Sequence, residues 1–244
     1  REARILGAVL KPGSYTMAAG ETINDLVKKA GGYTDNAYQF GAIYQNDEAK
    51  LINQKSKQIL YEEFLDNIIA VSQQNIGQSF DLTPIIRLTE KIKNTDPNGR
   101  IVIDLLNDSS INLYAIKDKD ELFIPEKNNV VYIYGETSSE GAVMYAQDKG
   151  VDYFVNKAGG YKRFADKKSI YVLHPNGESQ LYSSTRNIFE SSPKNKIKIY
   201  PGSIIFIPRE LDDSTPKRIA AQAYVSILGN LGIALASLSS INNN

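Results

Sequence analysis

The sequence predicts an α+β fold, built from two copies of one small domain and followed by a C-terminal amphipathic helix. Three observations support this prediction. A segment of about thirty residues recurs 128 positions later, short strand-like runs surround one helical segment in each copy, and the last 26 residues carry no charge. With 244 residues, 42% of them apolar and 23% charged, the composition is that of an ordinary globular protein of one large or two modest domains.

The repeat is the strongest signal in the sequence, because it runs without a gap. A shift of 128 residues places the pair Gly31 and Gly32 on Gly159 and Gly160. The other matches join residues of one kind: Gly7 with Gly135, Gly13 with Gly141, Ala18 with Ala146, Ile23 with Val151, Leu26 with Phe154, Val27 with Val155, and Lys29 with Lys157. We therefore expect two domains that share one fold.

Each copy begins with two short strands and a helix. The first strand ends at Gly7 or Gly135, and a turn leads into the second strand. In the first copy Thr22 and Asp25 have the spacing of a capping box, whereas the second copy has Gly150 at the cap position. Both helices stop at a glycine pair, as expected where the chain needs a left-handed residue after the last turn.

Further strands follow each helix. In the second copy, residues 169–174 and 178–183 flank a Pro-Asn-Gly turn at 175–177, a pattern typical of a hairpin. Both copies close on an apolar run that ends in proline, over residues 118–125 and 200–208. A hairpin, one helix packed across the sheet, and further strands together predict an α+β domain of β-grasp type.

The chain divides into three parts on this interpretation. The first domain covers residues 1–128, the second covers 129–210, and a linker with the C-terminal helix covers 211–244. The chain opens directly on a strand-like run, and we expect it to be part of a longer protein whose export signal, lipidation and N-terminal domain lie elsewhere.

The first copy contains an insertion that the second lacks. From Gly32 to Ile124 the chain runs 92 residues, whereas from Gly160 to Ile207 it runs 47. The excess predicts a helical insertion at about residues 53–99, where apolar residues recur at helical spacing. These residues are Leu60, Phe64, Ile68 and Val71.

The last part of the chain has the pattern of one long helix. No residue from 219 to 244 is charged, and residues 219–241 are predominantly apolar. Thr215 and Pro216 form a cap-then-proline pair that starts a helix. The 23 residues of a helix over 219–241 would span about 34 Å, against about 30 Å of hydrocarbon in a bilayer. We therefore expect a membrane-inserting helix.

Two faces of this helix differ in polarity. The polar residues fall in one sector, which we expect to line a pore: Gln222, Ser226, Asn230, Ser237 and Ser240. The large apolar residues fall roughly opposite, where we expect lipid: Tyr224, Ile227, Leu228, Leu231, Leu235 and Leu238. A ring of such helices turns the polar stripe toward a wet lumen. The alternative is a soluble helix whose leucine face packs on the domains, although a solvated face usually carries Lys or Glu.

The repeated unit resembles a known domain. The strand and turn around Gly13, the segment from Gly20 to Tyr33, and the closing strand that ends in Ile-Pro are similar to the SLBB domain, a soluble ligand-binding β-grasp. Two such domains followed by a C-terminal amphipathic helix resemble the outer-membrane polysaccharide export family (Wza-like). The resemblance covers nearly the whole chain, although the insertion is not part of a minimal SLBB domain.

This resemblance implies a membrane assembly. Members of the family form a homo-oligomeric ring, an octamer, whose SLBB domains enclose a periplasmic cavity. The C-terminal helices form an α-helical barrel through the bacterial outer membrane, in contact with its lipid, and capsular or extracellular polysaccharide leaves through it. An inner-membrane polysaccharide co-polymerase is the implied partner.

Other chemistry is not indicated by the sequence. Lys+Arg and Asp+Glu balance at 28 each, so no basic patch predicts nucleic-acid binding, and the absence of cysteine rules out disulfides. His174 is the single histidine and follows a strand at a turn, where we expect a surface position. Asp118, Asp120 and Glu121 predict a solvated turn rather than a metal site. We expect no enzyme activity, catalytic residue, metal or cofactor.

Two functions from different classes remain open. The first is a subunit of an oligomeric channel that exports polysaccharide. The second is a soluble periplasmic SLBB module that binds an oligosaccharide and forms no pore. For Tyr33 and Tyr161, which follow the glycine pairs, we expect packing in the core or at an interface rather than stacking on sugars.

Overall fold

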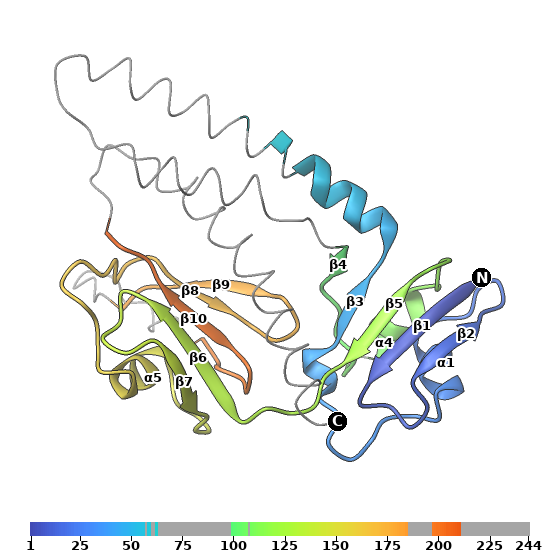
Figure 1. Ribbon diagram of the computed structural model, residues 1–244, viewed down its shortest axis with the longest axis horizontal. Helices are drawn as coiled ribbons and strands as arrows, with labels where there is room; N and C mark the ends of the chain where they lie inside the picture. The colour runs from blue at the N-terminus through green and yellow to red at the C-terminus, as the bar shows by residue number, and fades with distance from the viewer. Residues whose placement is uncertain (57, 60–61, 63–98, 107, 185–196, 211–244) are drawn as a thin grey trace.

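The computed structural model describes residues 1–56, 58–59, 62, 99–106, 108–184 and 197–210 (Figure 1). These residues form two mixed five-stranded sheets, each with a helix packed against it, so the predicted α+β class is confirmed. The predicted linker and C-terminal helix, and most of the predicted insertion, lie outside the described residues. No helix within the described ranges is long and apolar enough to cross a membrane.

The first sheet has the order β2-β1-β5-β3-β4. Its strands are β1 (Glu2–Gly7), β2 (Gly13–Thr16), β3 (Ile43–Gln45), β4 (Arg100–Ile101) and β5 (Glu121–Ile124). The central pair β1–β5 is parallel and the other pairs are antiparallel. The helix α1 (Ile23–Lys29) buries Ile23, Leu26 and Val27 in the core of this domain.

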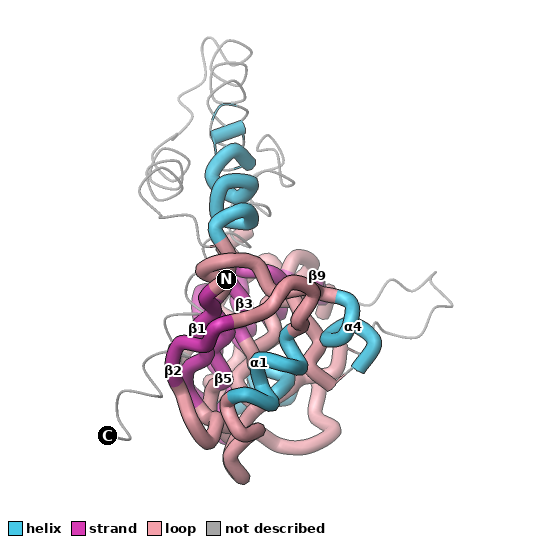
Figure 2. The backbone as a smooth tube through the Cα atoms, turned by 90° about the vertical axis from the view of Figure 1, so that its right-hand side faces the viewer, coloured by secondary structure: helices cyan, strands magenta, loops and turns pink. Residues whose placement is uncertain are grey.

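Three helical segments accompany this sheet. The 3-10 helix η1 (Gln39–Gly41) precedes β3, residues 47–56 are helical, and α4 (Asp108–Leu113) precedes β5. Figure 2 shows α4 beside α1, and the two helices are in contact. Most of the insertion predicted at about residues 53–99 lies outside the described residues, and its bounds stay a prediction.

The second sheet repeats the first in the order β7-β6-β10-β8-β9. Its strands are β6 (Val130–Gly135), β7 (Gly141–Met144), β8 (Ile170–Leu173), β9 (Ser179–Tyr182) and β10 (Ile204–Ile207), and its helix is α5 (Val151–Lys157). Both ends of β6, β7 and α5 lie 128 residues after those of β1, β2 and α1. The sequence repeat is thus a repeat of structure, and β8 and β9 form the predicted hairpin. The boundaries 1–128, 129–210 and 211–244 stay predictions.

In each domain a glycine lies where the first strand closely approaches the closing strand. Gly7 and Gly135 have φ of 84° and 95°. A Cβ atom at either residue would lie 2.1 Å from a carbonyl oxygen, that of Ile124 or Ile207. Each of these oxygens accepts a hydrogen bond from the residue after the glycine, at 2.7 Å and 2.8 Å. The close approach of the two strands therefore requires glycine.

The glycine pairs close the helices. Gly31 donates its N–H to Lys28 O, and Gly32 donates to Val27 O, each at 3.0 Å. The second domain repeats both bonds, from Gly159 to Asn156 O at 3.1 Å and from Gly160 to Val155 O at 2.9 Å. All four glycines have φ between 82° and 94°. This is the Schellman arrangement, in which left-handed residues satisfy carbonyls of the last helical turn.

An interdomain joint connects the two units, made of Phe40, Arg100, the turn 175–177 and Tyr200. The Phe40 and Tyr200 ring centroids lie 4.2 Å apart. Arg100, on the edge strand nearest the second domain (Figure 1), donates through Nη2 to Pro175 O. A Cβ atom at Gly177 would lie 2.7 Å from Arg100 Nε, so the guanidinium fits closely against this turn.

Two predicted surface positions are wrong. His174 is only 2% exposed, because Tyr200 and Ser203 cover the turn: the imidazole meets the Tyr200 ring edge-on at 5.3 Å, and its Nδ1 lies 3.3 Å from Ser203 Oγ. Burial lowers the pKa of this imidazole. Asp120 is fully buried and accepts hydrogen bonds from Tyr44 Oη and from Lys117 N, while Asp118 is exposed as predicted.

Candidate functional site

The pore-lining and lipid-facing residues predicted for the C-terminal helix all lie in 211–244, outside the described residues. Their roles stay predictions. Among the described residues, a half-open cavity lies in the second domain. It measures about 530 Å³, within the usual range for small-molecule sites.

The cavity opens between three segments of the second domain. These are the loop that enters α5, the end of β9 and the segment that leads into β10. Polar, charged and aromatic side chains line it together with apolar ones. The polar and aromatic residues of the lining include Tyr145, Lys149, Asp152, Tyr153, Tyr182 and Lys198.

Asp152 forms hydrogen bonds with several side chains at this cavity. Its Oδ1 accepts hydrogen bonds from Tyr161 Oη at 2.8 Å and from Ser184 Oγ at 2.7 Å, and its Oδ2 accepts one from Tyr182 Oη at 2.7 Å. Burial, together with donation to Asp152, raises the pKa of Tyr182 well above its ordinary value. The tyrosines therefore stay neutral donors, and three hydroxyl groups satisfy the Asp152 carboxylate from inside the protein.

The charges that line the cavity balance, with Lys149 and Lys198 against Asp148 and Asp152. Lys149 and Lys198 are both exposed, and Asp148 is the exposed carboxylate beside them. Lys149 Nζ lies 5.5 Å from the centre of the Tyr153 ring, which gives this ring a cation–π partner. The half-buried Tyr153 ring packs edge-on against Phe154, at 5.2 Å between centroids.

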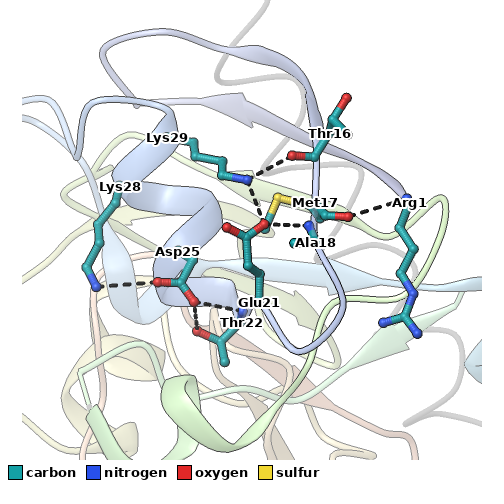
Figure 3. Close-up of polar contacts among 9 residues, drawn as sticks. All are labelled: Arg1, Thr16, Met17, Ala18, Glu21, Thr22, Asp25, Lys28 and Lys29. Carbon is teal, nitrogen blue, oxygen red and sulfur yellow. Dashed lines mark hydrogen bonds and ion pairs between the residues drawn. The ribbon is translucent and has the colours of Figure 1, made fainter.

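In the same region of the first domain, the acidic side chains make contacts with neighbouring residues (Figure 3). Glu21 accepts hydrogen bonds from Lys29 Nζ at 2.6 Å and from Ala18 N at 2.7 Å, and the contact with Lys29 lowers the pKa of its carboxyl. Asp25 Oδ2 accepts both the N–H and the hydroxyl of Thr22 at 3.0 Å, which lowers the pKa of Asp25. These carboxylates are therefore occupied within their own loop.

The segment that precedes the closing strand makes different backbone contacts in the two domains. In the first domain Ile116 N donates to Glu21 O at 2.8 Å, and Ala115 forms a bridge with Thr22. Ile199 is the counterpart of Ile116, since each lies five residues before its closing strand, and both are buried. Among the described residues no backbone hydrogen bond joins Ile199 to Lys149, the counterpart of Glu21. The cavity opens where this backbone hydrogen bond is missing.

The sequence analysis missed this site. A signal was present, because the 128-residue shift places Lys149 on Glu21, Asp152 on Asn24 and Tyr153 on Asp25. The acidic Glu21 of the first copy thus corresponds to a basic residue in the second copy, and the acidic Asp25 corresponds to an aromatic one. Tyr33 and Tyr161 pack against the two cores, as expected. No group of three His or carboxylate side chains in the described part of the chain is placed to hold a metal ion.

Comparisons with known proteins agree with this architecture. A family model for the SLBB domain matches residues 3–48, which include most of β1 and all of β2, α1 and β3. The first domain is therefore similar to the SLBB domain over these residues, and the second domain repeats the strand order of the first.

The similarity extends to a named export protein. Two Escherichia coli sequences of the polysialic acid transport protein KpsD are each 26% identical to this chain over 117 residues. Each match covers 48% of this chain and 20% of the relative, so the matched part is one fifth of the relative's length. Together with the domain match, this supports the predicted assignment of the chain to the SLBB polysaccharide export family.

Proposed function

We propose that this chain is a subunit of a homo-oligomeric outer-membrane channel that exports capsular or extracellular polysaccharide. The observation that carries the proposal is the tandem of SLBB-type domains, in a chain that is similar to a polysialic acid transport protein. The SLBB domains lie in the periplasm and form the ring, and polysaccharide passes through its centre. An inner-membrane polysaccharide co-polymerase hands the polymer on, and no reaction or cofactor is involved.

The edges of the second sheet support assembly into a ring. The edge strands β7 and β9 contain no charged residue and no proline, and they expose Met144 (71%) and Leu181 (54%). Monomeric proteins usually protect such edges with charges, prolines or bulges. Contact of β7 in one copy with β9 in the next would be head-to-tail, and such contacts close into a ring when the rotation between copies closes.

The C-terminal helix adds membrane insertion in this proposal. Its polar stripe, from Gln222 to Ser240, faces the lumen, and its leucine face contacts lipid. The test compares the full chain with a chain cut after Arg209. The full chain should form closed rings in detergent, visible by electron microscopy and native mass spectrometry, and the shortened chain should stay in solution without detergent. Failure to find any oligomer of the full chain, in detergent or lipid, overturns the proposal.

A paired substitution tests the two helix faces. Asn230→Lys places the ammonium group in the wet lumen and should allow insertion. Leu231→Lys places it in hydrocarbon, at a cost of about 2.5–3.5 kcal/mol per helix, and should block membrane assembly while the SLBB domains stay folded. Equal membrane fractionation of the two variants, with thermal stability lost only in Leu231→Lys, would instead identify a soluble helix packed on the domains.

The cavity of the second domain favours a second candidate function, a soluble periplasmic module that binds an oligosaccharide. Such a module needs no detergent and forms no pore. Stable monomers of the full chain that bind oligosaccharide in plain buffer would support this alternative over the channel.

A further inference from the structure

We propose that the second domain presents a basic face that binds the phosphate headgroups of an anionic membrane surface. This face, called the exit face below, lies where the chain leaves the second domain and consists of residues 162–168 and 209–210. The proposal rests on the proposed function, because it assumes that the segment after residue 210 enters a membrane. The position of the face in the tandem, its charge and one exposed aromatic ring support it.

The two domains build this face with the same backbone contacts. In each domain, two hydrogen bonds tie the loop after the glycine pair to the end of the closing strand. In the second domain they run from Asp166 N to Pro208 O at 2.9 Å and from Glu210 N to Phe164 O at 2.7 Å. The counterparts in the first domain run from Tyr38 N to Pro125 O at 2.8 Å and from Lys127 N to Asn36 O at 3.0 Å. The two faces can therefore be compared residue by residue.

The first domain uses its copy of the exit face, residues 34–40 and 126–127, next to the unit that follows it in the chain. Phe40 belongs to this loop, and its ring contacts Tyr200 of the second domain at 4.2 Å between centroids. The unit that follows residue 210 is the predicted linker with its membrane helix. By the same placement, the exit face of the second domain lies next to the membrane surface.

The charge of the exit face reverses between the two copies. In the first domain Asp35, Glu126 and Lys127 give a net charge of −1. In the second domain Asp166 and Glu210 stand against five exposed cations, a net charge of +3: Lys162, Arg163, Lys167, Lys168 and Arg209. Counting Glu136 as well, whose backbone oxygen accepts the Lys162 N–H, leaves +2. Within the described part of the chain no ion pair joins the five cations to a carboxylate.

One exposed aromatic ring lies beside two of these cations. Phe164 is 49% exposed, and the guanidinium carbons of Arg163 and Arg209 lie 5.4 Å and 4.9 Å from the centre of its ring. The counterpart of Phe164 in the first domain is the polar Asn36. Guanidinium groups bind phosphate through paired N–H donors, and phenylalanine inserts at the boundary between headgroups and acyl chains. The cluster therefore offers both kinds of contact that an anionic lipid surface takes.

The test measures partition of the full chain onto vesicles of phosphatidylcholine, with or without phosphatidylglycerol, by flotation. Each cation near an anionic surface raises the partition coefficient about fivefold. Arg163→Gln and Arg209→Gln should each lower partition onto the anionic vesicles about fivefold and leave partition onto the neutral vesicles unchanged. Lys11→Gln, at an exposed lysine of the first domain, should change neither coefficient.

Equal partition of the wild type onto the two kinds of vesicle overturns the proposal, and an acidic protein surface then becomes the better occupant of the exit face. Equal losses in Lys11→Gln and the two arginine variants also overturn it. Circular dichroism of each variant excludes unfolding as the cause of a loss.

Extraction with sodium carbonate separates this proposal from the channel proposal, because carbonate releases chains held only by headgroups and leaves inserted helices in the membrane. Chains that resist extraction but show no preference for phosphatidylglycerol remove the headgroup contact alone. Chains that carbonate releases, with a preference that the arginine variants lose, remove the channel alone.

Discussion

Alanine in place of Gly7 should destabilise the first domain much more than alanine at another left-handed glycine. The added Cβ would lie 2.1 Å from Ile124 O, and real Cβ atoms essentially never come within 3.0 Å of such a neighbour. Either β1 or β5 must therefore move by about 1 Å at the end of their parallel pair. The bond from Ala8 N to Ile124 O, now 2.7 Å long, cannot survive that movement.

The expected loss in the free energy of unfolding has two contributions. The left-handed backbone costs a residue with a Cβ about 1–2 kcal/mol, and loss of a buried hydrogen bond costs about 1–3 kcal/mol. Gly7→Ala should therefore lower the free energy of unfolding by about 2–5 kcal/mol. Gly20 provides the control, because its φ is 88° and a Cβ there would meet nothing within 4 Å. Gly20→Ala should cost only the backbone contribution.

Urea denaturation of the full chain, followed by circular dichroism, measures both variants. Gly135→Ala and its open-space control Gly160→Ala repeat the comparison in the second domain, at φ of 95° and 84°. If Gly7→Ala is no more destabilising than Gly20→Ala, the close contact between the first and closing strands is not what keeps glycine at this position.

Three further predictions concern the second domain and the joint. Asp152→Asn leaves one acceptor oxygen for three hydroxyl donors and should lower the free energy of unfolding, measured by urea denaturation, by about 1–3 kcal/mol. An unchanged denaturation midpoint would show that the donors turn to water. Phe40→Ala and Tyr200→Ala should show a coupling of about 0.5–1.5 kcal/mol in a double-mutant cycle, and additivity would argue against the joint. Burial lowers the pKa of His174, so the neutral imidazole contributes its full stability above pH 6.5, its ordinary pKa, and loses it as the pH falls further. In His174→Gln the free energy of unfolding should therefore change less between about pH 6.5 and 5 than in the wild type. Identical pH profiles of the two proteins would contradict this.

Local patterns predicted much of each domain. Ile23, Leu26 and Val27 recur at helical spacing, and all three are at most 5% exposed. The glycines that end strands and helices need backbone conformations that few other residues adopt, so their positions mark the ends of elements. The parallel pairing of β1 with β5 is different, because more than one hundred residues separate the strands and no local pattern encodes it.

Burial by distant segments explains what the sequence analysis got wrong. His174 and Asp120 stand next to turns, where polar residues are usually solvated. His174 is covered by Tyr200, and Asp120 by Tyr44, each from another part of the domain. The cavity was missed for the same reason, since its walls come from three separate segments. Comparison of the two copies position by position is the method that would have found it.

The interdomain joint contains a residue that directly follows the predicted insertion. Arg100 belongs to the first described strand after the insertion, and it contacts both halves of the protein: β4 pairs with β3 in the first sheet, while the guanidinium binds Pro175 O in the second domain. A substitution of Arg100 would therefore affect the edge of the first sheet and the turn at 175–177 of the second domain at once.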